Sequence, residues 1–532
     1  MEIHLLIISA VTILCVMLNR VSSEFGVPSL FVFIVLGMLF GSDGIYKINF
    51  HNYVFAEQIC SVALIIIMFT GGFGTNWSEA KPVAVKSFIL ATFGVVFTAG
   101  ILALFCHIVL NMGLFESMLI GSVISSTDAA SVFSILRSKR LGLKYNTASM
   151  LEVESGSNDP CSYMLTMITL SFMSSKVPTG EIIFMTFSQF SFGVIAGILI
   201  GIFAVFTLRN VEFSTDGIDM VFVIGIALMA YAFTSAIGGN GYLSVYIAGI
   251  ILGNSKISNK ISLVHFFNGI TGLAQMIIFF LLGLLVFPSQ LPAVFFSSFL
   301  IALFLTFVAR PIAIFSLLTP AKCSIRQQLL VSFAGIRGAA SIVFAVMVVV
   351  SGNTVKNDVF NITFCIVLLS IAFQGSLLPW VSKKLKMTDA AADVMKTFSD
   401  YTEEVDVQFI KLALSENHPW INKKIMELTL PPDTLIVIIL RGANKIIPSG
   451  ATTLLEDDIC VLSAPAFQDD RNIKLSEYKI DRDSKWSGKK ISEFSPTHEE
   501  LVVMIKRSGR SVIPRGNTTI NEGDVLVINK IS

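Results

Sequence analysis

Charged residues are scarce in this sequence. Only 14% of its 532 residues are Asp, Glu, Lys or Arg, while 54% are hydrophobic. This composition excludes an ordinary soluble protein of this length and indicates a polytopic membrane protein that lies in the lipid bilayer. Acidic and basic residues are nearly balanced, 37 against 38, and the lack of a basic excess argues against nucleic acid as a partner.

Motifs for metals, disulfides and enzymatic chemistry are also missing. The seven cysteines are scattered, with no C-x-x-C pair and no accompanying histidines, so we expect neither a disulfide framework nor a metal site. No G-x-G-x-x-G fingerprint occurs after the apolar region, which excludes a nucleotide-binding Rossmann half there. An intramembrane aspartyl protease would need a G-x-G-D motif, which the chain lacks. We therefore expect a protein that is not an enzyme and that needs no cofactor.

Apolar stretches long enough to cross, or nearly cross, a bilayer recur along the chain. We predict thirteen of them, at about 3–19, 27–45, 54–72, 83–110, 115–136, 147–175, 181–208, 218–236, 240–253, 261–286, 291–318, 327–350 and 358–381. The ninth is short, so it is either a half-span or a tilted helix. The N-terminal stretch lacks a basic n-region and a small-x-small cleavage site, which favours a first membrane helix over a removable signal.

Basic residues divide the connections between these stretches into two unequal sets. The poorer set contains only Lys47, Lys176 and Lys356. The richer set contains Arg20, Lys81, Lys86, Arg137, Lys139, Arg140, Lys144, Arg209, Lys256, Lys260, Lys322 and Arg326. The positive-inside rule then predicts an outer N-terminus and a cytoplasmic C-terminus in the cell inner (plasma) membrane, which an odd number of spans satisfies.

Two polar interruptions indicate an internal repeat. The fifth stretch contains "SSTDAAS" (125–131) and the twelfth contains "GIRGAAS" (335–341). The odd offset between them predicts two halves of opposite orientation, and broken helices in corresponding positions of such halves mark a transport site. Two unrelated kinks are the alternative, because three shared letters are weak support. The predicted fold class is an all-α polytopic membrane protein of about 13 spans with inverted repeats, followed by a small α+β cytoplasmic region.

Four ionisable side chains lie deep within the apolar stretches: Asp128, Glu154, Asp159 and Arg337. Such groups are costly in a bilayer and usually mark a path for ions or protons. Asp159 follows about twelve residues of its stretch, which places it roughly 18 Å deep on a helix. Asp128 enters from the other side at a similar count. We expect the two carboxylates to meet near the middle of the membrane.

The chemistry of these groups separates their roles. Arg337 keeps its proton, so at depth we expect it to need a carboxylate, and Glu154 is the predicted partner in a structural ion pair. Asp159 is then left without a permanent cation. A buried carboxylate of this kind binds either a proton or a monovalent cation, which is the minimal mechanism of an antiporter. Thr127 and Ser155 supply further oxygens for an alkali cation.

Other polar residues have plainer interpretations. Asn158 and Ser157 are expected to support the site by joining helices, and Glu152 to lie in a funnel nearer the surface. Arg310 is expected to extend its side chain toward the membrane surface. A different class of protein, a ligand-gated potassium channel, stays open because "TGGFGT" (70–75) faintly resembles a carbonyl filter.

The segments "SSTDAAS", "ESGSNDP" and "GIRGAAS" resemble the signature segments of the monovalent cation–proton antiporters, in particular the NhaP-like potassium/proton type associated with cell-volume regulation. The resemblance implies a thirteen-helix homodimer that works by an elevator-type alternating access. It also implies that Asp159 and Asp128 carry the cation and the proton, with Thr127 and Ser155 as ligands. Asn158 stands where electrogenic relatives have an aspartate, which implies electroneutral exchange of K⁺ or Na⁺ for H⁺. Thr70 departs from the pattern, since relatives commonly carry an acid there.

The C-terminal region repeats itself. Residues 418–462 and 484–528 align without a gap at an offset of 66, which pairs Trp420 with Trp486. Each copy resembles the TrkA-C (RCK-C) module of potassium transporters and channels, and some such modules bind cyclic di-AMP. The candidate ligand-facing residues are Asn444, Ile446, Ile447, Pro448, Arg510, Val512, Ile513 and Pro514. Dimerisation alone is an equally good interpretation of the tandem.

These observations predict four parts of the chain. An antiporter domain is expected over residues 1–386, a linker over 387–404, and two RCK-C-like modules over 405–466 and 467–532.

Overall fold

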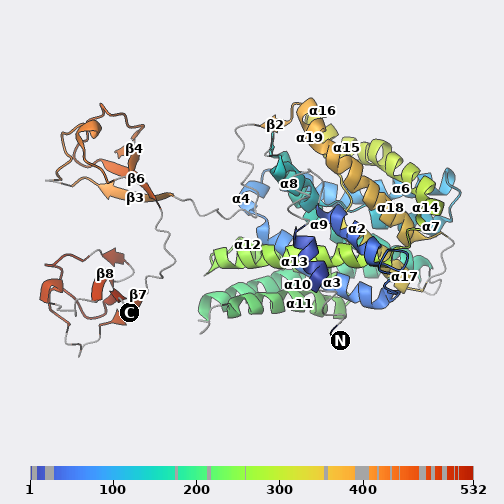
Figure 1. Cartoon of the computed structure of the whole chain (residues 1–532), viewed down its shortest axis with the longest axis horizontal. Helices are drawn as coiled ribbons and strands as arrows, with labels where there is room; N and C mark the ends of the chain where they lie inside the picture. The colour runs from blue at the N-terminus through green and yellow to red at the C-terminus, as the bar shows by residue number, and fades with distance from the viewer. Residues whose placement is uncertain are drawn as a thin grey trace. The chain divides into compact units, whose positions relative to one another are not determined.

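The computed structural model forms two compact units, Met1–Tyr401 and Thr402–Ser532 (Figure 1). Each is described by itself. The structure describes residue 2, residues 9–17, and residues 29–530 apart from 140, 174–177, 212–216, 258, 353–356, 390–406, 416–417, 432–433, 443, 466–474, 481–483, 485, 494–499, 508–509 and 513.

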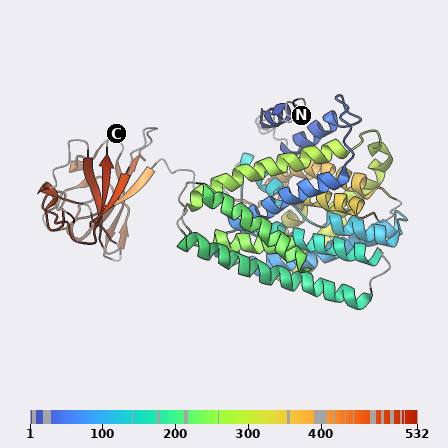
Figure 2. The ribbon, with the colours of Figure 1, turned by 90° about the horizontal axis from the view of Figure 1, so that it is seen from below.

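The first unit is helical (Figures 1 and 2). Its helices are α2 (Ser29–Phe40), α3 (Tyr53–Gly74), α4 (Trp77–Ala80), α5 (Ala84–Ile89), α6 (Val95–Ile108), α7 (Leu114–Ile124), α8 (Ala129–Ser138), α9 (Thr147–Met173), α10 (Thr179–Asn210), α11 (Ile218–Ala236), α12 (Gly241–Gly253), α13 (Lys260–Leu285), α14 (Leu291–Phe304), α15 (Arg310–Leu318), α16 (Ile325–Phe333), α17 (Ala339–Val350), α18 (Val359–Leu369) and α19 (Ser376–Lys384). Side-chain caps begin several of them. Asn52, Asn240, Ser324 and Asp358 accept a backbone N–H at the starts of α3, α12, α16 and α18.

The helices follow the predicted spans. Among the described residues, each stretch from 27–45 onward coincides with a helix or an interrupted helix. Of the stretch 3–19 the structure describes residues 9–17, and these are helical. Seven helices in this part are long and apolar enough to cross a bilayer. The ninth stretch is confirmed as short, since α12 has 13 residues. The helix α9 is long enough, with 27 residues, but falls outside the seven because its acidic residues lower its hydropathy.

Three wide π turns interrupt the long helices: η1 (Leu90–Gly94) between α5 and α6, η2 (Leu305–Ala309) between α14 and α15, and η3 (Ser370–Gly375) between α18 and α19. The first two fall in the fourth and eleventh predicted spans, which are seven spans apart. This is the separation of the two polar interruptions. The inverted repeat is therefore visible in backbone geometry as well as in three shared letters.

Small residues set the spacing in one group of helices. A Cβ on Gly37 of α2 would lie 2.2 Å from the Phe280 carbonyl oxygen of α13, and one on Gly72 of α3 would lie 2.2 Å from that of Tyr246 in α12. A Cβ on Gly197 of α10 would lie 2.8 Å from the Ser244 carbonyl oxygen of α12. Glycine at these positions lets the helix backbones approach closely, as is typical of membrane helices. We call this group, α2, α3 and α10 to α13, the scaffold, and α5 to α9 with α14 to α19 the core bundle.

A short β-ladder in the membrane unit joins the turn between α8 and α9 to the residues that follow α19. Strand β1 (Gly142–Leu143), in the turn between α8 and α9, pairs antiparallel with β2 (Thr388–Asp389), which follows α19. The Lys144 N–H donates to the Met387 carbonyl at 2.9 Å, and the Met387 side chain is buried. The prediction that a linker begins at residue 387 is therefore wrong by three residues, because 387–389 are held against the membrane unit.

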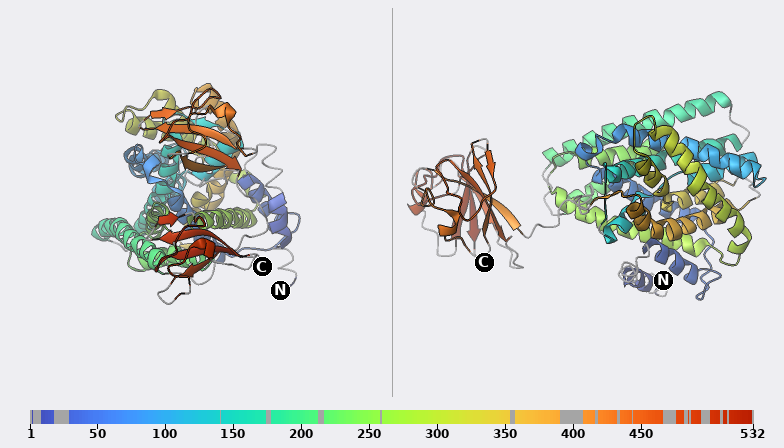
Figure 3. Two further views of the ribbon diagram at one scale, coloured as in Figure 1. Left: turned by 90° about the vertical axis from the view of Figure 1, so that its left-hand side faces the viewer. Right: turned by 90° about the horizontal axis from the view of Figure 1, so that it is seen from above.

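The second unit contains the two predicted modules (Figure 3). The first has β3 (Val407–Ala413), β4 (Leu435–Arg441), β5 (Asn444–Ile446) and β6 (Ile459–Pro465) in the order β3-β6-β4-β5. The second has β7 (Leu475–Lys479), β8 (Glu500–Arg507), β9 (Arg510–Val512) and β10 (Val525–Lys530) in the order β7-β10-β8-β9. All pairs are antiparallel, and each sheet packs on its own small apolar core. Both copies thus share one topology.

The proposed ligand-facing residues differ in exposure. The side chains of Ile446 and Val512 are partly buried and pack against the module cores. Ile447 is 89% exposed. Ile513 and the side chains of Asn444 and Arg510 lie outside the described part.

An Arg–Asp clamp recurs in both modules at the offset of 66. Arg441 donates from Nε to Asp458 at 2.7 Å, and Arg507 does the same to Asp524 at 2.8 Å. Each arginine also donates to a threonine carbonyl, at 2.9 Å and 2.6 Å. The hydrogen bond from Arg441 lowers the pKa of the buried Asp458 carboxyl despite its burial. Since the folded pKa lies below the unfolded one, the clamp stabilises the module above the unfolded pKa and loses this contribution as pH falls through the folded pKa.

Removing the first clamp should loosen only its own module. We expect Arg441→Met to lower the local stability of the first module by about 1–3 kcal/mol at pH 7, because Asp458 stays buried without its donor. Hydrogen exchange of the full-length protein in detergent, read by mass spectrometry, should show faster exchange in β4 and β6 but not in β8 and β10.

Arg507→Met is the matched control and should reverse this pattern. The difference between Arg441→Met and the wild type should shrink below about pH 4, where a protonated Asp458 no longer needs a cation. Equal effects of either variant on both modules would contradict independent clamps.

Candidate functional site at the crossing of two broken helices

The interruptions at residues 125–128 and 334–338 lie side by side. The Asp128 N–H donates to the Ile336 carbonyl at 2.8 Å, and the Ser126 and Ser341 hydroxyls are 3.1 Å apart. The two non-helical segments thus satisfy part of each other's backbone within the membrane, where water is not available to do so. The two motifs predicted broken helices in corresponding positions, and the structure shows in addition that the two breaks bond to each other.

Gly338 permits this close approach. A Cβ at this position would lie 2.3 Å from Asp128 Oδ2, so a larger residue would displace the carboxylate. Asp128 in turn accepts hydrogen bonds from the backbone N–H and the hydroxyl of Ser131, in the first turn of α8. Its carboxylate therefore lies at a helix N-terminus, where a negative charge is favoured.

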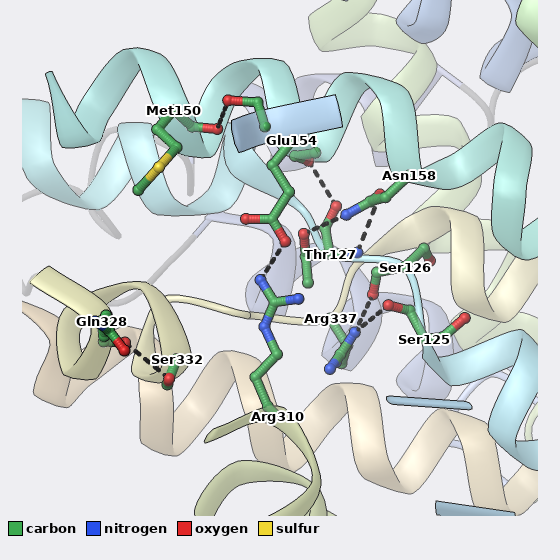
Figure 4. A network of polar contacts seen from close by, with 12 residues as sticks. Ser125, Ser126, Thr127, Met150, Glu154, Asn158, Arg310, Gln328, Ser332 and Arg337 are labelled. Atoms are coloured by element: carbon green, nitrogen blue, oxygen red, sulfur yellow. Dashed lines mark hydrogen bonds and ion pairs between the residues drawn. The ribbon is translucent and has the colours of Figure 1, made fainter. Parts of the chain in front are cut away.

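Arg337 is buried at the crossing, where it forms no ion pair with a carboxylate of the described residues (Figure 4). Its Nη1 donates to the carbonyl oxygens of Ser125 and Ser126 at 2.7 Å and 2.6 Å. These carbonyls follow the C-terminus of α7, the negative end of the helix dipole. The guanidinium thus stabilises the broken end of one repeat from the broken segment of the other.

The predicted ion pair between Glu154 and Arg337 is wrong. Glu154 pairs instead with Arg310, and both side chains are 1% exposed (Figure 4). Arg310 therefore does not extend to the membrane surface as predicted. Its position at the start of α15, directly after the π turn η2, places it inside the core bundle. A guanidinium buried there needs a counter-charge, whereas Arg337 has the α7 carbonyls.

A second network fixes the Thr127 segment on α9. Asn158 Nδ2 donates to the Thr127 hydroxyl at 2.6 Å, and Asn158 Oδ1 accepts from the Thr127 N–H at 3.3 Å. The Ser155 hydroxyl donates to the Thr127 carbonyl at 2.6 Å. Ser155 and Asn158, one helical turn apart, therefore bind the N–H, the carbonyl and the hydroxyl of Thr127. Ser157 is not part of this network and faces a different cavity.

A cavity of about 460 Å³ opens beside the crossing. Its lining from the core bundle includes Thr127, Asp128, Glu152, Ser155 and Asp159. The structure thus brings Asp128 and Asp159 together with both predicted oxygen donors, and it places Glu152 on the same wall. Asp159 Oδ1 is buried and has no hydrogen-bond partner within the described chain.

Part of the cavity lining belongs to the scaffold. It includes Thr70 from α3 and Asn268, Thr271 and Gln275 from α13. Thr271 donates to the Thr70 hydroxyl at 2.8 Å. The three α13 residues were missed in the sequence, although their spacing, by three and then four, places them on one face of the helix and this polar stripe could have been recognised.

A cavity lined by the carboxylates of Asp128, Glu152 and Asp159, bounded by two groups of membrane helices and the crossing of two broken helices, defines a secondary transporter for cations and protons. Residues 7–384 match the family described as the sodium/hydrogen exchanger, transmembrane, and this match shows that the chain belongs to that family. Residues 410–466 and 475–528 match the TrkA-C domain. The protein is therefore a membrane transporter and not an enzyme.

Relatives match over most of the chain. A protein of Alkalimonas amylolytica called K(+)/H(+) antiporter NhaP is 30% identical over 87% of this chain and 81% of its own. One of Shewanella sp. strain ANA-3, called K(+)/H(+) antiporter NhaP2, is 32% identical over 84% and 79%. The fold resembles the sodium proton antiporter MjNhaP1 of Methanocaldococcus jannaschii, with a TM-score of 0.63, 22% identity, and coverage of 72% of this chain and 99% of that one.

The partner of Glu154 can be tested by a double-mutant cycle. We expect Glu154→Gln to destabilise the protein by about 3–5 kcal/mol, because it leaves the Arg310 guanidinium buried without its partner. Replacing both members, as Glu154→Leu with Arg310→Met, should restore much of this loss. The measurement is thermal unfolding of the purified protein in detergent. Coupling of Glu154 to Arg337→Met that exceeds its coupling to Arg310→Met would contradict the pairing.

Proposed function

We propose that this protein exchanges K⁺ or Na⁺ for H⁺ at Asp159. The observation that carries the proposal is the Asp159 carboxylate, which has one buried oxygen without a hydrogen-bond partner in the described chain and faces a cavity of about 460 Å³. A carboxylate in this position is stable when it holds a proton or a cation. Because the Asp159 carboxylate holds either a proton or a cation, the two ligands compete for it. When the site opens to each face of the membrane in turn, this competition exchanges one ligand for the other, which is antiport.

The surrounding oxygens suit an alkali cation. Asp128, Ser155 and Thr127 line the same cavity as Asp159 and supply carboxylate, hydroxyl and carbonyl oxygens. Hard cations prefer such ligands. The relatives with 30% and 32% identity are both called K(+)/H(+) antiporters, which favours K⁺ as the cation.

Electroneutral exchange is supported by the partners of Asn158. Its amide bonds to the hydroxyl and the N–H of Thr127 and, unlike a carboxylate, does not take up a proton. Asp159 is then the exchanging carboxylate of α9 that faces the ion cavity at depth. One proton leaves for each monovalent cation that binds.

Access alternates by movement of the core bundle against the scaffold. Asp159 and Asp128 lie on the core bundle, whereas Thr70 and Thr271 lie on the scaffold, so the cavity is a boundary between the two groups. A shift along this boundary opens the site to either face in turn. We propose that the scaffold also forms a homodimer interface, with the N-terminus outside and the modules in the cytoplasm.

A potassium channel is not favoured. Residues 70–74, whose sequence faintly resembles a carbonyl filter, are helical and belong to α3. Their carbonyl groups serve the helix, so they do not form the extended ring that a filter requires.

Asp159→Asn should abolish exchange. In everted vesicles, wild-type protein should dissipate an imposed pH gradient on addition of K⁺ or Na⁺, while the variant should not, because an amide neither releases a proton nor neutralises a cation. Glu152→Gln on the same wall is the control and should retain exchange. Undiminished exchange in Asp159→Asn would end this mechanism, and the same assay with each cation alone determines selectivity.

The TrkA-C modules regulate exchange in this proposal, with cyclic di-AMP as a candidate ligand near the exposed Ile447 and the equivalent loop at Pro514. The chain offers one physical route for the signal. The ladder of β1 with β2 joins the start of the C-terminal region to the turn between α8 and α9, the helices that follow Asp128 and carry Asp159.

This route predicts a loss of coupling in Asp389→Pro. The Lys144 N–H bonds to the Met387 carbonyl, so the next hydrogen-bonded pair of the antiparallel ladder is Gly142 with Asp389, and proline at 389 removes a ladder donor. In the wild type, deletion of residues 390–532 should change the exchange rate; in the Asp389→Pro background the same deletion should have little effect. Asp389→Asn, which keeps the backbone donor, should behave as the wild type. An equal response to deletion in both backgrounds would exclude the ladder as the route.

A further inference from the structure

A second cavity, of about 400 Å³, lies on another side of α9. It is bounded by α5 and α9 of the core bundle and by α10 and α12 of the scaffold, and its lining is mostly apolar: Val85, Phe88, Ile89, Val194, Leu243 and Ile247 are among its residues. Ser157 and Cys161 of α9 face this cavity, whereas Ser155 and Asp159 face the ion cavity. The two cavities therefore flank one helix.

The mouth of this cavity is apolar and exposed. Val85 is 72% exposed, Phe88 50% and Phe190 41%. These residues belong to helices that cross the bilayer, at 84–108 and 180–210, so lipid surrounds the mouth. Water does not fill an apolar cavity favourably, and an empty one loses packing on its walls. A hydrocarbon chain is the occupant that satisfies both conditions.

The length of the cavity matches one leaflet. Its lining on α9 runs from Val153 to Met164, and eleven helical steps correspond to about 16 Å, roughly half of the 30 Å hydrocarbon thickness. At its inner end, the Asn240 amide donates to the Pro160 carbonyl at 2.9 Å and accepts from the Leu243 N–H at 3.1 Å. Asn240 thereby satisfies its polar groups within the protein and leaves an apolar cavity.

The other end of the cavity lies at a membrane surface. Its lining there includes Trp77 and Ala80, and Trp77 is 50% exposed. Lys81 follows Ala80 and is exposed, and Lys86 follows Val85 and is half-buried. A tryptophan and lysines at one end of membrane helices are typical of the interface with lipid headgroups. Two cations next to an apolar cavity complement an anionic headgroup attached to a chain.

We propose that this cavity binds one anionic phospholipid of the leaflet on the Trp77 side. One of its two acyl chains lies between the core bundle and the scaffold, and its headgroup lies at Lys81 and Lys86. Because α9 carries Asp159 and moves against α12 in the proposed exchange cycle, the bound lipid also changes the exchange rate. This second clause rests on the proposed function, whereas the binding itself does not.

Binding can be measured on the full-length protein by native mass spectrometry. After incubation with phosphatidylglycerol and phosphatidylcholine of the same acyl chains, we expect retention of one phosphatidylglycerol per chain with a preference of about tenfold or more, since each lysine contributes about 1 kcal/mol. Lys81→Gln with Lys86→Gln should bring this preference close to one.

A filled cavity tests the position of the chain. Ala84 lines the cavity, and Ala84→Trp should abolish retention of both lipids. Ala232→Trp, at an exposed position of α11, is the matched control and should retain phosphatidylglycerol as the wild type does. If Ala84→Trp lowers the thermal midpoint of unfolding, Val194→Trp fills the cavity from the opposite wall.

Two results would overturn the site. One is equal phosphatidylglycerol retention in a folded cavity-filling variant and the wild type; the other is an unchanged headgroup preference in the double Gln variant. Exchange rates in vesicles with and without phosphatidylglycerol then test the second clause. A bound lipid with no effect on the rate overturns the link to exchange but leaves both the site and the antiport mechanism in place.

Discussion

The crossing of two broken helices is the constraint on which the transport site depends. Interrupting a membrane helix exposes backbone groups that lipid cannot satisfy. Here the broken segments bond to each other, and Arg337 places its charge on the carbonyls that end α7. Asp128 is a member of the same crossing, since its N–H bonds to Ile336 and its carboxylate caps α8. The contacts that satisfy the backbone groups of the two broken helices therefore also form the transport site.

The charges around the crossing are divided between structure and function. Glu154 pairs with Arg310, and Nη1 of Arg337 donates to two carbonyl oxygens at the end of α7, which offset part of its charge. Nε and Nη2 of Arg337, like Nε and Nη1 of Arg310, have no hydrogen-bond partner in the described chain. Asp159 keeps an oxygen without a partner in the described chain. Burial of a charge without compensation is unfavourable, and in the proposed mechanism this makes the carboxylate available to a proton or a cation in turn. In that mechanism the fixed contacts hold the helices in place while Asp159 changes its ligand.

Much of this arrangement was predictable from the sequence, and the failures have identifiable causes. The length of the apolar stretches predicted the spans, and the two polar interruptions predicted broken helices in corresponding positions, although not that the two breaks bond to each other. The partner of Glu154 was missed because the π turn η2, which places Arg310 inside the bundle, has no simple sequence signal. The bonds from Arg337 to the carbonyls at the end of α7 were missed because they join segments about 210 residues apart in the sequence, whose relative position the sequence pattern does not reveal. The Arg441–Asp458 clamp was missed although the offset of 66 repeats it in the second module.

The distance in sequence between Glu154 and Arg310 has a consequence for biogenesis. The helix α9 enters the bilayer 156 residues before its counter-charge is synthesised. At about 5–20 residues per second, the ribosome needs roughly 8–30 s to deliver that arginine. During this interval α9, already poor in hydropathy, carries an uncompensated acid. Its insertion therefore depends on shelter from the earlier helices or the translocon, or on a transient proton on Glu154.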